Sequence, residues 1–255
     1  MRVTSIQVEM KDRSKEENLA NVLNLMDRAG SCDLILLPEI WPCGFFRFDR
    51  YRAESEPLDG LIMSALKKRA VDLKCHVMTG SIVERDGRDL FNTTLLLNSE
   101  GEIIARYRKV HLFGYQSGEK ELLKGGDEVV VAPTPWGPAG LSICYDLRFP
   151  EFYRKMVDAG AAIFLVASAW PHARLETWTL FNRARAIENL AYVFSCNCAG
   201  ANKGQQYAGH SMIVDPMGNI IAEGGDGECF VSAEIDPNLV DSVRKEFPAL
   251  KDRVF

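Results

Sequence analysis

The sequence has no apolar run long enough to cross a membrane. Its longest such run, residues 159–170, contains a glycine and a serine and falls short of the ~20 residues that a membrane helix needs. The N-terminus alternates like a strand and lacks the basic-then-apolar order of a secretory signal. Basic residues are not in surplus, since the formal net charge is -5 at pH 7. We therefore expect no membrane partner and no nucleic-acid partner.

The cysteines do not form a disulfide framework. Seven of them are scattered irregularly through 255 residues, which favours a reducing cytoplasm. Cys196 and Cys198 are the nearest approach to a zinc site, with His172 or His210 as further ligands. A spacing of one residue and the lack of a second cysteine pair do not match structural zinc sites. We expect neither a metal nor a cofactor. We expect the partner to be a small molecule.

Helix-like and strand-like segments alternate along the chain, which predicts an α/β protein. Ser14 and Glu17 form a capping-box pattern that begins a helix, and Gly30 ends it. Continuous apolar runs of the kind that buried strands use follow between helical patterns. The expected strands are residues 34–37, 77–83, 93–97, 162–167 and 192–196, and the further helices are residues 59–73, 150–160 and 175–191.

Two segments resemble each other. Residues 98–105 and 215–222 each place a turn with a glycine between strand-like runs, which predicts two hairpins. The pair indicates two related sheet halves packed face to face, unless so short a match is a coincidence. No linker, low-complexity tract or break in composition divides the chain, so we predict a single domain over residues 1–255.

Three strand-like segments, residues 34–37, 103–107 and 141–143, lead into reactive side chains: Glu39, Lys109 and Cys144. Open α/β sheets place their sites at the carboxyl ends of strands. A thiol is a useful nucleophile only as the thiolate, so a neighbouring group must take its proton. A carboxylate, an ammonium and a thiol brought together supply a base, an oxyanion partner and a nucleophile for acyl transfer. This set requires no histidine.

Three segments resemble the signature segments of the nitrilase superfamily of carbon-nitrogen hydrolases. They are residues 36–39 (LLPE), 107–113 (YRKVHLF) and 144–151 (CYDLRFPE). The similarity spans nearly the whole chain. It implies a four-layer α-β-β-α sandwich in which Glu39 is the general base, Lys109 stabilises the oxyanion and Cys144 is the nucleophile. The backbone N–H of Tyr145 would be the second oxyanion donor.

The resemblance also implies a second glutamate in the loop after the lysine. Counting back from Gly126 and Asp127, which resemble the family's Pro-Gly-Asp turn, selects Glu119. Because this turn reads Gly-Gly and the loop varies in length, Glu121 stays an alternative. The chosen carboxylate would hold Lys109 and the substrate nitrogen in place.

Arg148 suggests the class of substrate. It lies four residues beyond Cys144, where a guanidinium can hold a carboxylate in a bidentate fork. The string around it is most similar to the omega-amidase branch, which hydrolyses the terminal amide of short dicarboxylic monoamides such as 2-oxoglutaramate or succinamate. Trp170 would form a wall of the pocket, and Phe45 and Phe46 would close it.

Structural roles compete with some of these interpretations. Arg148 pairs with Asp146 or Glu151 if it is part of the scaffold. His111 lies two residues after Lys109 and is better explained as a structural residue than as a base for the thiol. Two further arginines, Arg183 and Arg185, are expected in intramolecular pairs.

Other functions stay open at this point. Within the superfamily, the alternatives are an N-carbamoyl amidohydrolase and a nitrilase. From another class, the chain would be an inactive binding or scaffold protein on the same fold. A catalytic Cys144 is expected to react with iodoacetamide faster than the other cysteines and with a depressed pH midpoint. Family members commonly dimerise, so we expect a homo-oligomer, a dimer or higher, formed by the helices that begin near Pro150 and Leu175.

Overall fold

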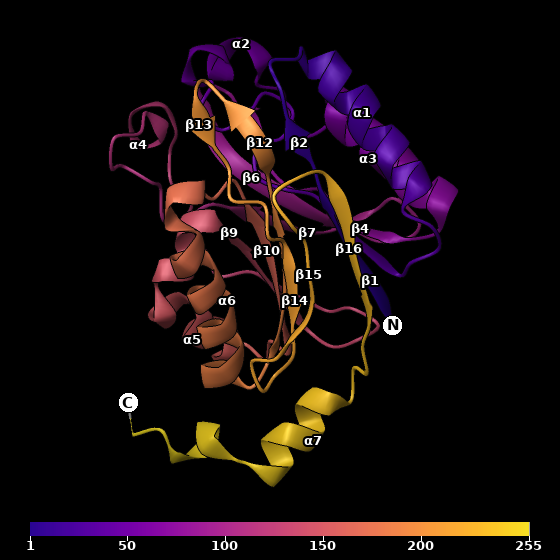
Figure 1. Cartoon of the computed structure of the whole chain (residues 1–255), viewed down its shortest axis with the longest axis vertical. Helices are drawn as coiled ribbons and strands as arrows, with labels where there is room; N and C mark the ends of the chain where they lie inside the picture. The colour runs from indigo at the N-terminus through magenta and orange to yellow at the C-terminus, as the bar shows by residue number, and fades with distance from the viewer. Residues whose placement is uncertain (255) are drawn as a thin grey trace.

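Two β-sheets lie face to face between two layers of helices in the computed structural model, which describes residues 1–254 (Figure 1). The first sheet has the order β16 (Cys229–Glu234), β1 (Arg2–Gln7), β3 (Leu34–Leu36), β4 (His76–Met78), β6 (Asp89–Leu97) and β5 (Ile82–Asp86), and β7 (Ile103–Arg108) also pairs with β6. The second has the order β15 (Ile220–Glu223), β14 (Met212–Val214), β11 (Tyr192–Asn197), β10 (Ile163–Ser168), β9 (Ala139–Ile143) and β8 (Val131–Ala132). A small third sheet joins β13 (Gln205–Gln206), β12 (Ala199–Asn202) and β2 (Glu9–Met10).

Helices cover the outer face of each sheet. α1 (Lys15–Arg28) and α3 (Leu61–Leu73) pack on the first sheet, and α5 (Pro150–Asp158) and α6 (Leu175–Asn189) pack on the second (Figure 1). The expected four-layer sandwich is therefore confirmed. The remaining helical segments are η1 (Phe48–Arg50), α2 (Tyr51–Glu54), α4 (Glu119–Leu122), η2 (Cys144–Arg148), η3 (His172–Arg174), α7 (Leu239–Glu246) and η4 (Ala249–Asp252). Within residues 1–254, no helix combines the length and the apolar character that a membrane crossing requires.

The central strands are apolar on both faces because both faces are covered. In β3, Leu34 and Leu36 join the core between the two sheets, whereas Ile35 joins the core under α1 and α3. All three side chains are at most 2% exposed. Parallel strands buried on both faces read as continuous apolar runs, which is why this strand could be recognised in the sequence.

The two predicted hairpins are confirmed, and they lie in different sheets. β6 and β7 pair antiparallel in the first sheet, and β14 and β15 do so in the second. The glycine of each turn, Gly101 or Gly218, has a positive φ of 77° or 81°. The sequence similarity between the two segments thus reflects equivalent turns in two facing sheets.

Several predicted boundaries differ from the structure by one to four residues, and two of the differences have a clear physical cause. The expected strand 77–83 is divided into β4 and β5 at Gly80, which has a φ of 65°. A Cβ at this glycine would lie 2.1 Å from the carbonyl oxygen of Pro38, so no larger residue fits against the segment that leads to Glu39. The helix expected from residue 59 begins at Leu61, where the carboxylate of Glu56 accepts a hydrogen bond from the Ile62 N–H at 2.7 Å.

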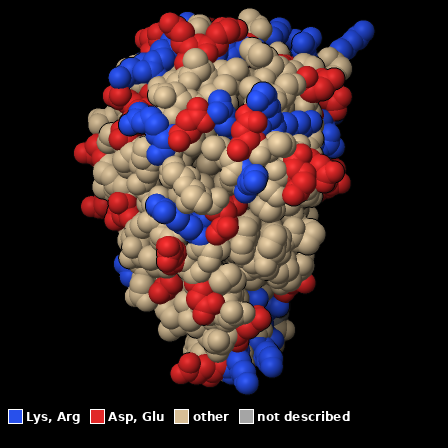
Figure 2. Space-filling view, turned by 90° about the vertical axis from the view of Figure 1, so that its right-hand side faces the viewer, with Lys and Arg blue, Asp and Glu red and all other residues tan. Residues whose placement is uncertain are grey.

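Charged side chains of both signs are interspersed on the face shown in Figure 2. No extended basic patch is visible there, in agreement with a formal net charge of -5. Three basic side chains also line a cavity at one end of the sandwich, as described below.

Candidate active site

Three charged side chains form a fully buried cluster at one end of the sandwich. Glu39 follows β3, Lys109 follows β7, and Glu119 is the first residue of α4. The Lys109 Nζ lies 2.8 Å from Glu39 Oε1 and 2.9 Å from Glu119 Oε1, and none of the three side chains is exposed. Glu121, the alternative to Glu119, lies at the surface. The structure thus brings together the residues that the sequence motifs selected.

The two carboxylates of the cluster are held by further donors. The side-chain amide of Asn92 donates to Glu39 Oε1 and to Glu119 Oε1, at 2.8 Å each. The backbone N–H of Ala169 donates to Glu39 Oε2 at 2.9 Å, and that of Phe113 donates to Glu119 Oε2 at 2.7 Å. Buried carboxylates are costly without such partners, so these contacts fix both side chains in one position.

The charge on Lys109 is stabilised by its two neighbours. Burial alone lowers the pKa of Lys109, but the carboxylates of Glu119 and Glu39 outweigh this effect and hold that pKa above its usual range. Burial raises the pKa of Glu119, and the ammonium of Lys109 opposes that rise. A buried cation is therefore present at neutral pH.

Cys144 lies at a sharp bend between β9 and η2. Its φ of 48° is in the left-handed region, which costs a residue other than glycine roughly 1–2 kcal/mol. The carboxylate of Asp146 holds the bend, because it accepts hydrogen bonds from the Ile143 N–H at 2.8 Å and the Tyr107 hydroxyl at 2.7 Å. His111 Nδ1 also lies 2.8 Å from Asp146 Oδ1. His111 therefore supports this bend, as its structural interpretation predicted.

The surroundings of Cys144 favour the protonated form of its thiol. Burial and the nearby carboxylate of Glu39 raise the pKa of Cys144 well above its usual value, although the ammonium of Lys109 lowers it in part. This direction does not agree with the depressed pH midpoint expected for labelling of Cys144. Sequence motifs place the residues together but do not show how deeply the thiol is buried.

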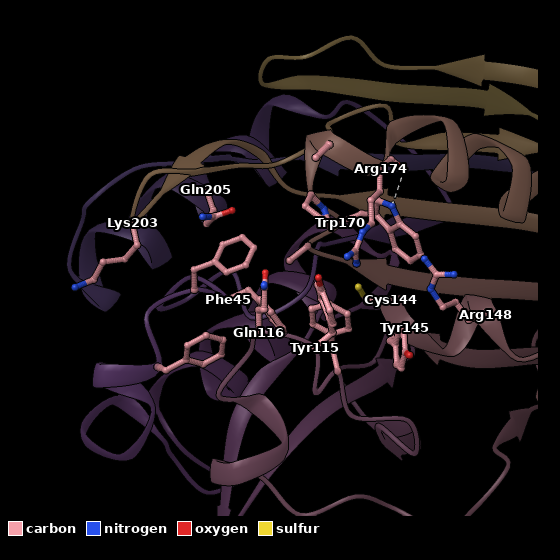
Figure 3. A pocket seen from close by; sticks show the side chains of 16 residues that line it. Phe45, Tyr115, Gln116, Cys144, Tyr145, Arg148, Trp170, Arg174, Lys203 and Gln205 are labelled. Atoms are coloured by element: carbon pink, nitrogen blue, oxygen red, sulfur yellow. Dashed lines mark hydrogen bonds between the residues drawn. The ribbon is translucent and has the colours of Figure 1, made fainter.

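A cavity of about 430 Å³ opens above Cys144 (Figure 3). Tyr145, Arg148 and Trp170 line it, as do Phe45 and Phe46. The structure thus places all of the expected pocket residues on one cavity. The other lining residues are Phe48, Phe113, Tyr115, Gln116, Ala169, Pro171, Ala173, Arg174, Lys203 and Gln205.

The cavity wall carries positive charge and no carboxylate. Arg148 and Arg174 make no hydrogen bond from their guanidinium groups and no ion pair with any residue in the range 1–254. Arg148 lies over the rings of Trp170 and Phe181, with its Cζ 5.9 and 5.3 Å from their centroids. Lys203, by contrast, lies 3.5 Å from the carboxylate of Asp49. Two guanidinium groups are thus available to an anion.

The alternative scaffold role of Arg148 is not observed. Asp146, one of its two expected partners, accepts hydrogen bonds at the Cys144 bend instead, and no ion pair joins Arg148 to Glu151 among residues 1–254. Trp170, on which Arg148 lies, is itself fixed: its indole N–H donates to the Arg174 carbonyl oxygen at 2.9 Å. The cavity wall therefore has a defined shape on the side of the two arginines.

The other candidates have structural partners. Cys196 Sγ donates to the Ile6 carbonyl oxygen at 3.1 Å, and no group of three potential metal ligands occurs within residues 1–254. Arg185 pairs with Glu188 at 2.6 Å, as expected. Arg183 differs from the expected ion pair, since its Nε donates to the carbonyl oxygen of Gly218 at 3.0 Å.

Three residues of the site were not selected from the sequence: Asn92, Asp146 as the support of the bend, and Arg174. Asn92 carries a usable signal, because it is the one amide side chain among the apolar and threonine residues 90–97 of β6. Asp146 and Arg174 carry none, since their roles depend on contacts with segments distant in the chain.

Comparisons with known proteins give a consistent result. Residues 2–245 match the family model described as carbon-nitrogen hydrolase. The chain is 35% identical over 260 residues to the 2-oxoglutaramate amidase of Paenarthrobacter nicotinovorans, covering 98% of this chain and 88% of that protein. It is 35% identical over 252 residues to the 2-oxoglutaramate amidase of Bacillus subtilis, covering 98% of this chain and 96% of that protein.

A solved structure has the same fold over the whole chain. The crystal structure of Nit3 from Saccharomyces cerevisiae, a member of branch 10 of the nitrilase superfamily, superposes with a TM-score of 0.92 at 31% identity. The match covers 100% of this chain and 97% of the yeast protein. The similarity therefore extends over the whole fold and is not confined to the segments that meet at the cavity.

Proposed function

The chain belongs to the carbon-nitrogen hydrolase family, and we propose that it hydrolyses the terminal amide of a small carboxylate-bearing substrate through a thioester at Cys144. Its class, a carbon-nitrogen hydrolase, agrees with the expectation from the motifs. One observation carries the proposal. A buried ammonium held between two carboxylates lies beside a thiol whose cavity is lined by two unpaired guanidinium groups.

In the first half of the proposed reaction, Cys144 attacks the amide carbon while Glu39 takes the thiol proton. The carbonyl oxygen becomes an oxyanion that is bound by Lys109 and the backbone N–H of Tyr145. Glu39 then gives its proton to the leaving nitrogen, ammonia departs and a thioester remains. Because the resting thiol is protonated, attack and proton transfer must be coupled.

Lys109 has one N–H available for this oxyanion. One of its three N–H bonds points to Glu39 Oε1 at 2.8 Å, and a second is shared between the two oxygens of Glu119 at 2.9 and 3.0 Å. The third is free to meet the developing charge. Glu119 thus acts on the reaction by positioning Lys109. Asn92 holds the carboxylates of Glu39 and Glu119 in place by donating to both.

In the second half, Glu39 activates a water that attacks the thioester carbon. The same oxyanion donors bind the second tetrahedral intermediate, and the carbon–sulfur bond breaks as the carbon–oxygen double bond re-forms. The proton held by Glu39 returns to the Cys144 sulfur, and the acid product is released. One carboxylate therefore serves as base and acid in turn.

The charge of the cavity supports an acid amide as substrate. We assign the carboxylate of the substrate to Arg148, whose guanidinium has five donors and no partner among residues 1–254, with Arg174 as a second cation. Trp170 would pack against the carbon chain. The printed name of two relatives, 2-oxoglutaramate amidase, supports 2-oxoglutaramate as the substrate, and we propose succinamate as a second short monoamide.

An ammonia-release assay on a panel of amides, nitriles and carbamoyl amino acids tests this function. We expect turnover of 2-oxoglutaramate or succinamate that disappears in Cys144→Ala. Release of carbon dioxide together with ammonia would identify an N-carbamoyl amidohydrolase instead. Absence of turnover across the whole panel would refute the enzymatic proposal and favour a binding protein.

We also propose that the single domain acts in the cytoplasm as a homo-oligomer. The large apolar side chains Leu180 and Ile187 on α6 are 63% and 47% exposed, which supports an interface on this helix. All seven cysteines are unpaired, as a reducing compartment favours. Sedimentation of the wild type beside Leu180→Glu tests the interface, and a monomeric wild type would contradict it.

A further inference from the structure

Two cysteines outside the active site have their sulfur atoms close together. Cys32 Sγ lies 3.7 Å from Cys75 Sγ, although the two residues are 43 positions apart. Cys32 lies in the link from α1 to β3, and Cys75 lies in the link from α3 to β4. These strands are parallel neighbours, and the His76 N–H donates to the Asp33 carbonyl oxygen at 2.9 Å. The backbones that carry the two thiols are therefore held side by side.

The two thiols differ in their access to solvent. Cys32 is partly exposed, whereas Cys75 is 1% exposed and its Sγ lies 3.1 Å from the His76 carbonyl oxygen. Neither residue lines the cavity above Cys144. An accessible cysteine backed by a second, shielded cysteine is the arrangement found in redox-sensitive pairs.

The neighbours of Cys32 favour loss of its proton. The hydrogen bond with Cys75 lowers the pKa of Cys32, burial opposes this, and Thr4 and Arg2 lower it further while Asp33 raises it. The same hydrogen bond, together with burial, raises the pKa of Cys75. The accessible sulfur is thus the first to become a thiolate, which is the reactive form.

We propose that Cys32 and Cys75 are a redox-sensitive pair that hydrogen peroxide joins as a reversible disulfide. The Cys32 thiolate attacks a peroxide oxygen, the O–O bond breaks, and the released hydroxide takes up a proton to become water. Cys32 is then a sulfenic acid. The Cys75 sulfur attacks the Cys32 sulfur, the S–S bond forms, the S–O bond breaks, and a second water leaves with the Cys75 proton. Two thiols lose two electrons, which reduce the peroxide to water.

The bond fits the surrounding structure. The sulfurs must approach from 3.7 Å to about 2 Å, and we expect side-chain rotation to supply this change while β3 and β4 stay paired. The cross-link would join the starts of β3 and β4, and Glu39 follows the opposite end of β3. We expect it to raise the melting temperature by roughly 5–10 °C and to leave the cavity unchanged.

The experiment uses the full chain with Cys144→Ala, so that oxidation of the cavity thiol does not interfere. After treatment with hydrogen peroxide, free thiols are alkylated and the digested peptides are mapped by mass spectrometry. We expect the loss of two thiols, a cross-linked peptide pair that contains Cys32 and Cys75, and full reversal by dithiothreitol. The matched control Cys229→Ser, which removes another partly exposed cysteine, should keep the cross-link.

Single substitutions separate the two roles. In Cys75→Ser, a sulfenic acid should accumulate on Cys32 and be trapped by dimedone. In Cys32→Ser, we expect neither a dimedone adduct on Cys75 nor a cross-linked peptide. The proposal is overturned if no thiols are lost, if the cross-link joins other cysteines, or if Cys32→Ser still reacts at Cys75. Unequal trapping in the two variants distinguishes a true pair from general oxidation of exposed thiols.

Discussion

Replacement of Glu39 by glutamine removes the proposed base and leaves the nucleophile in place. The substitution keeps the size of the side chain but removes one negative charge beside Cys144 and Lys109. General acid–base catalysis contributes typically 10²–10⁴-fold, and Glu39 is used in both halves of the reaction. We therefore expect kcat/KM to fall at least roughly 10³-fold, which is about 4 kcal/mol of barrier.

Alkylation of Cys144 in the same variant should not slow down, although turnover falls. In the wild type, the carboxylate of Glu39 raises the pKa of Cys144, and the ammonium of Lys109 lowers it. Without the carboxylate, Lys109 stays beside the sulfur, so the thiolate becomes easier to form. Iodoacetamide should accordingly label Cys144 in Glu39→Gln at least as fast as in the wild type near neutral pH, and its pH midpoint should move down.

The substitution also has a structural cost that must be measured separately. Glu39 accepts hydrogen bonds from Asn92, Lys109 and the Ala169 N–H, and a glutamine turns one acceptor into a donor that faces a donor. An unsatisfied buried group of this kind costs roughly 1–3 kcal/mol, to be read from chemical denaturation.

Glu121→Gln, at the surface, is the matched control. The reasoning is refuted if the folded Glu39→Gln protein keeps turnover within about tenfold of the wild type, or if it loses alkylation and turnover together.

Other substitutions separate positioning, substrate binding and support of the bend. Lys109→Ala should lower kcat by roughly 10²–10³-fold with little change in KM, and should lower the free energy of unfolding by roughly 3–5 kcal/mol because it leaves two buried carboxylates without a counter-charge. Arg148→Gln should raise KM for succinamate roughly tenfold or more and leave the neutral diamide succinamide unaffected; equal losses on both amides would contradict the assignment. Asp146→Ala should destabilise the protein by roughly 2–4 kcal/mol in denaturant titrations and reduce kcat, since the bend at Cys144 loses four hydrogen-bonding contacts, and unchanged stability would contradict that role.

The sequence predicts the parts of this fold that depend on local patterns. The two hairpins, the capping box at Ser14 and the apolar strand β3 each have signals within a few residues. The break at Gly80 was missed because it depends on the approach of the Pro38 carbonyl oxygen, which belongs to another segment. Apolar residues lie on both sides of the break, at residues 77–78 and 82–83, so the two strands read as one strand-like segment.

The candidate site shows the same limit. Glu39, Lys109 and Cys144 could be selected because each lies in a distinctive motif at a strand end. The raised pKa of Cys144, by contrast, depends on how far the surrounding layers exclude water from the thiol. No local motif carries that information. The role of Asn92 likewise follows from two carboxylates that meet it from different segments.

The thioester at Cys144 is the central claim, and rapid acid quenching of the wild type with 2-oxoglutaramate or succinamate tests it directly. Intact-mass analysis should show one acyl group per chain, and a digest should place it on the peptide that contains Cys144. The adduct should form together with the first equivalent of ammonia. Hydroxylamine should release it as a hydroxamate. Cys144→Ala should give neither adduct nor ammonia. Ammonia release by Cys144→Ala, or wild-type turnover without an adduct or a hydroxamate, would contradict the account.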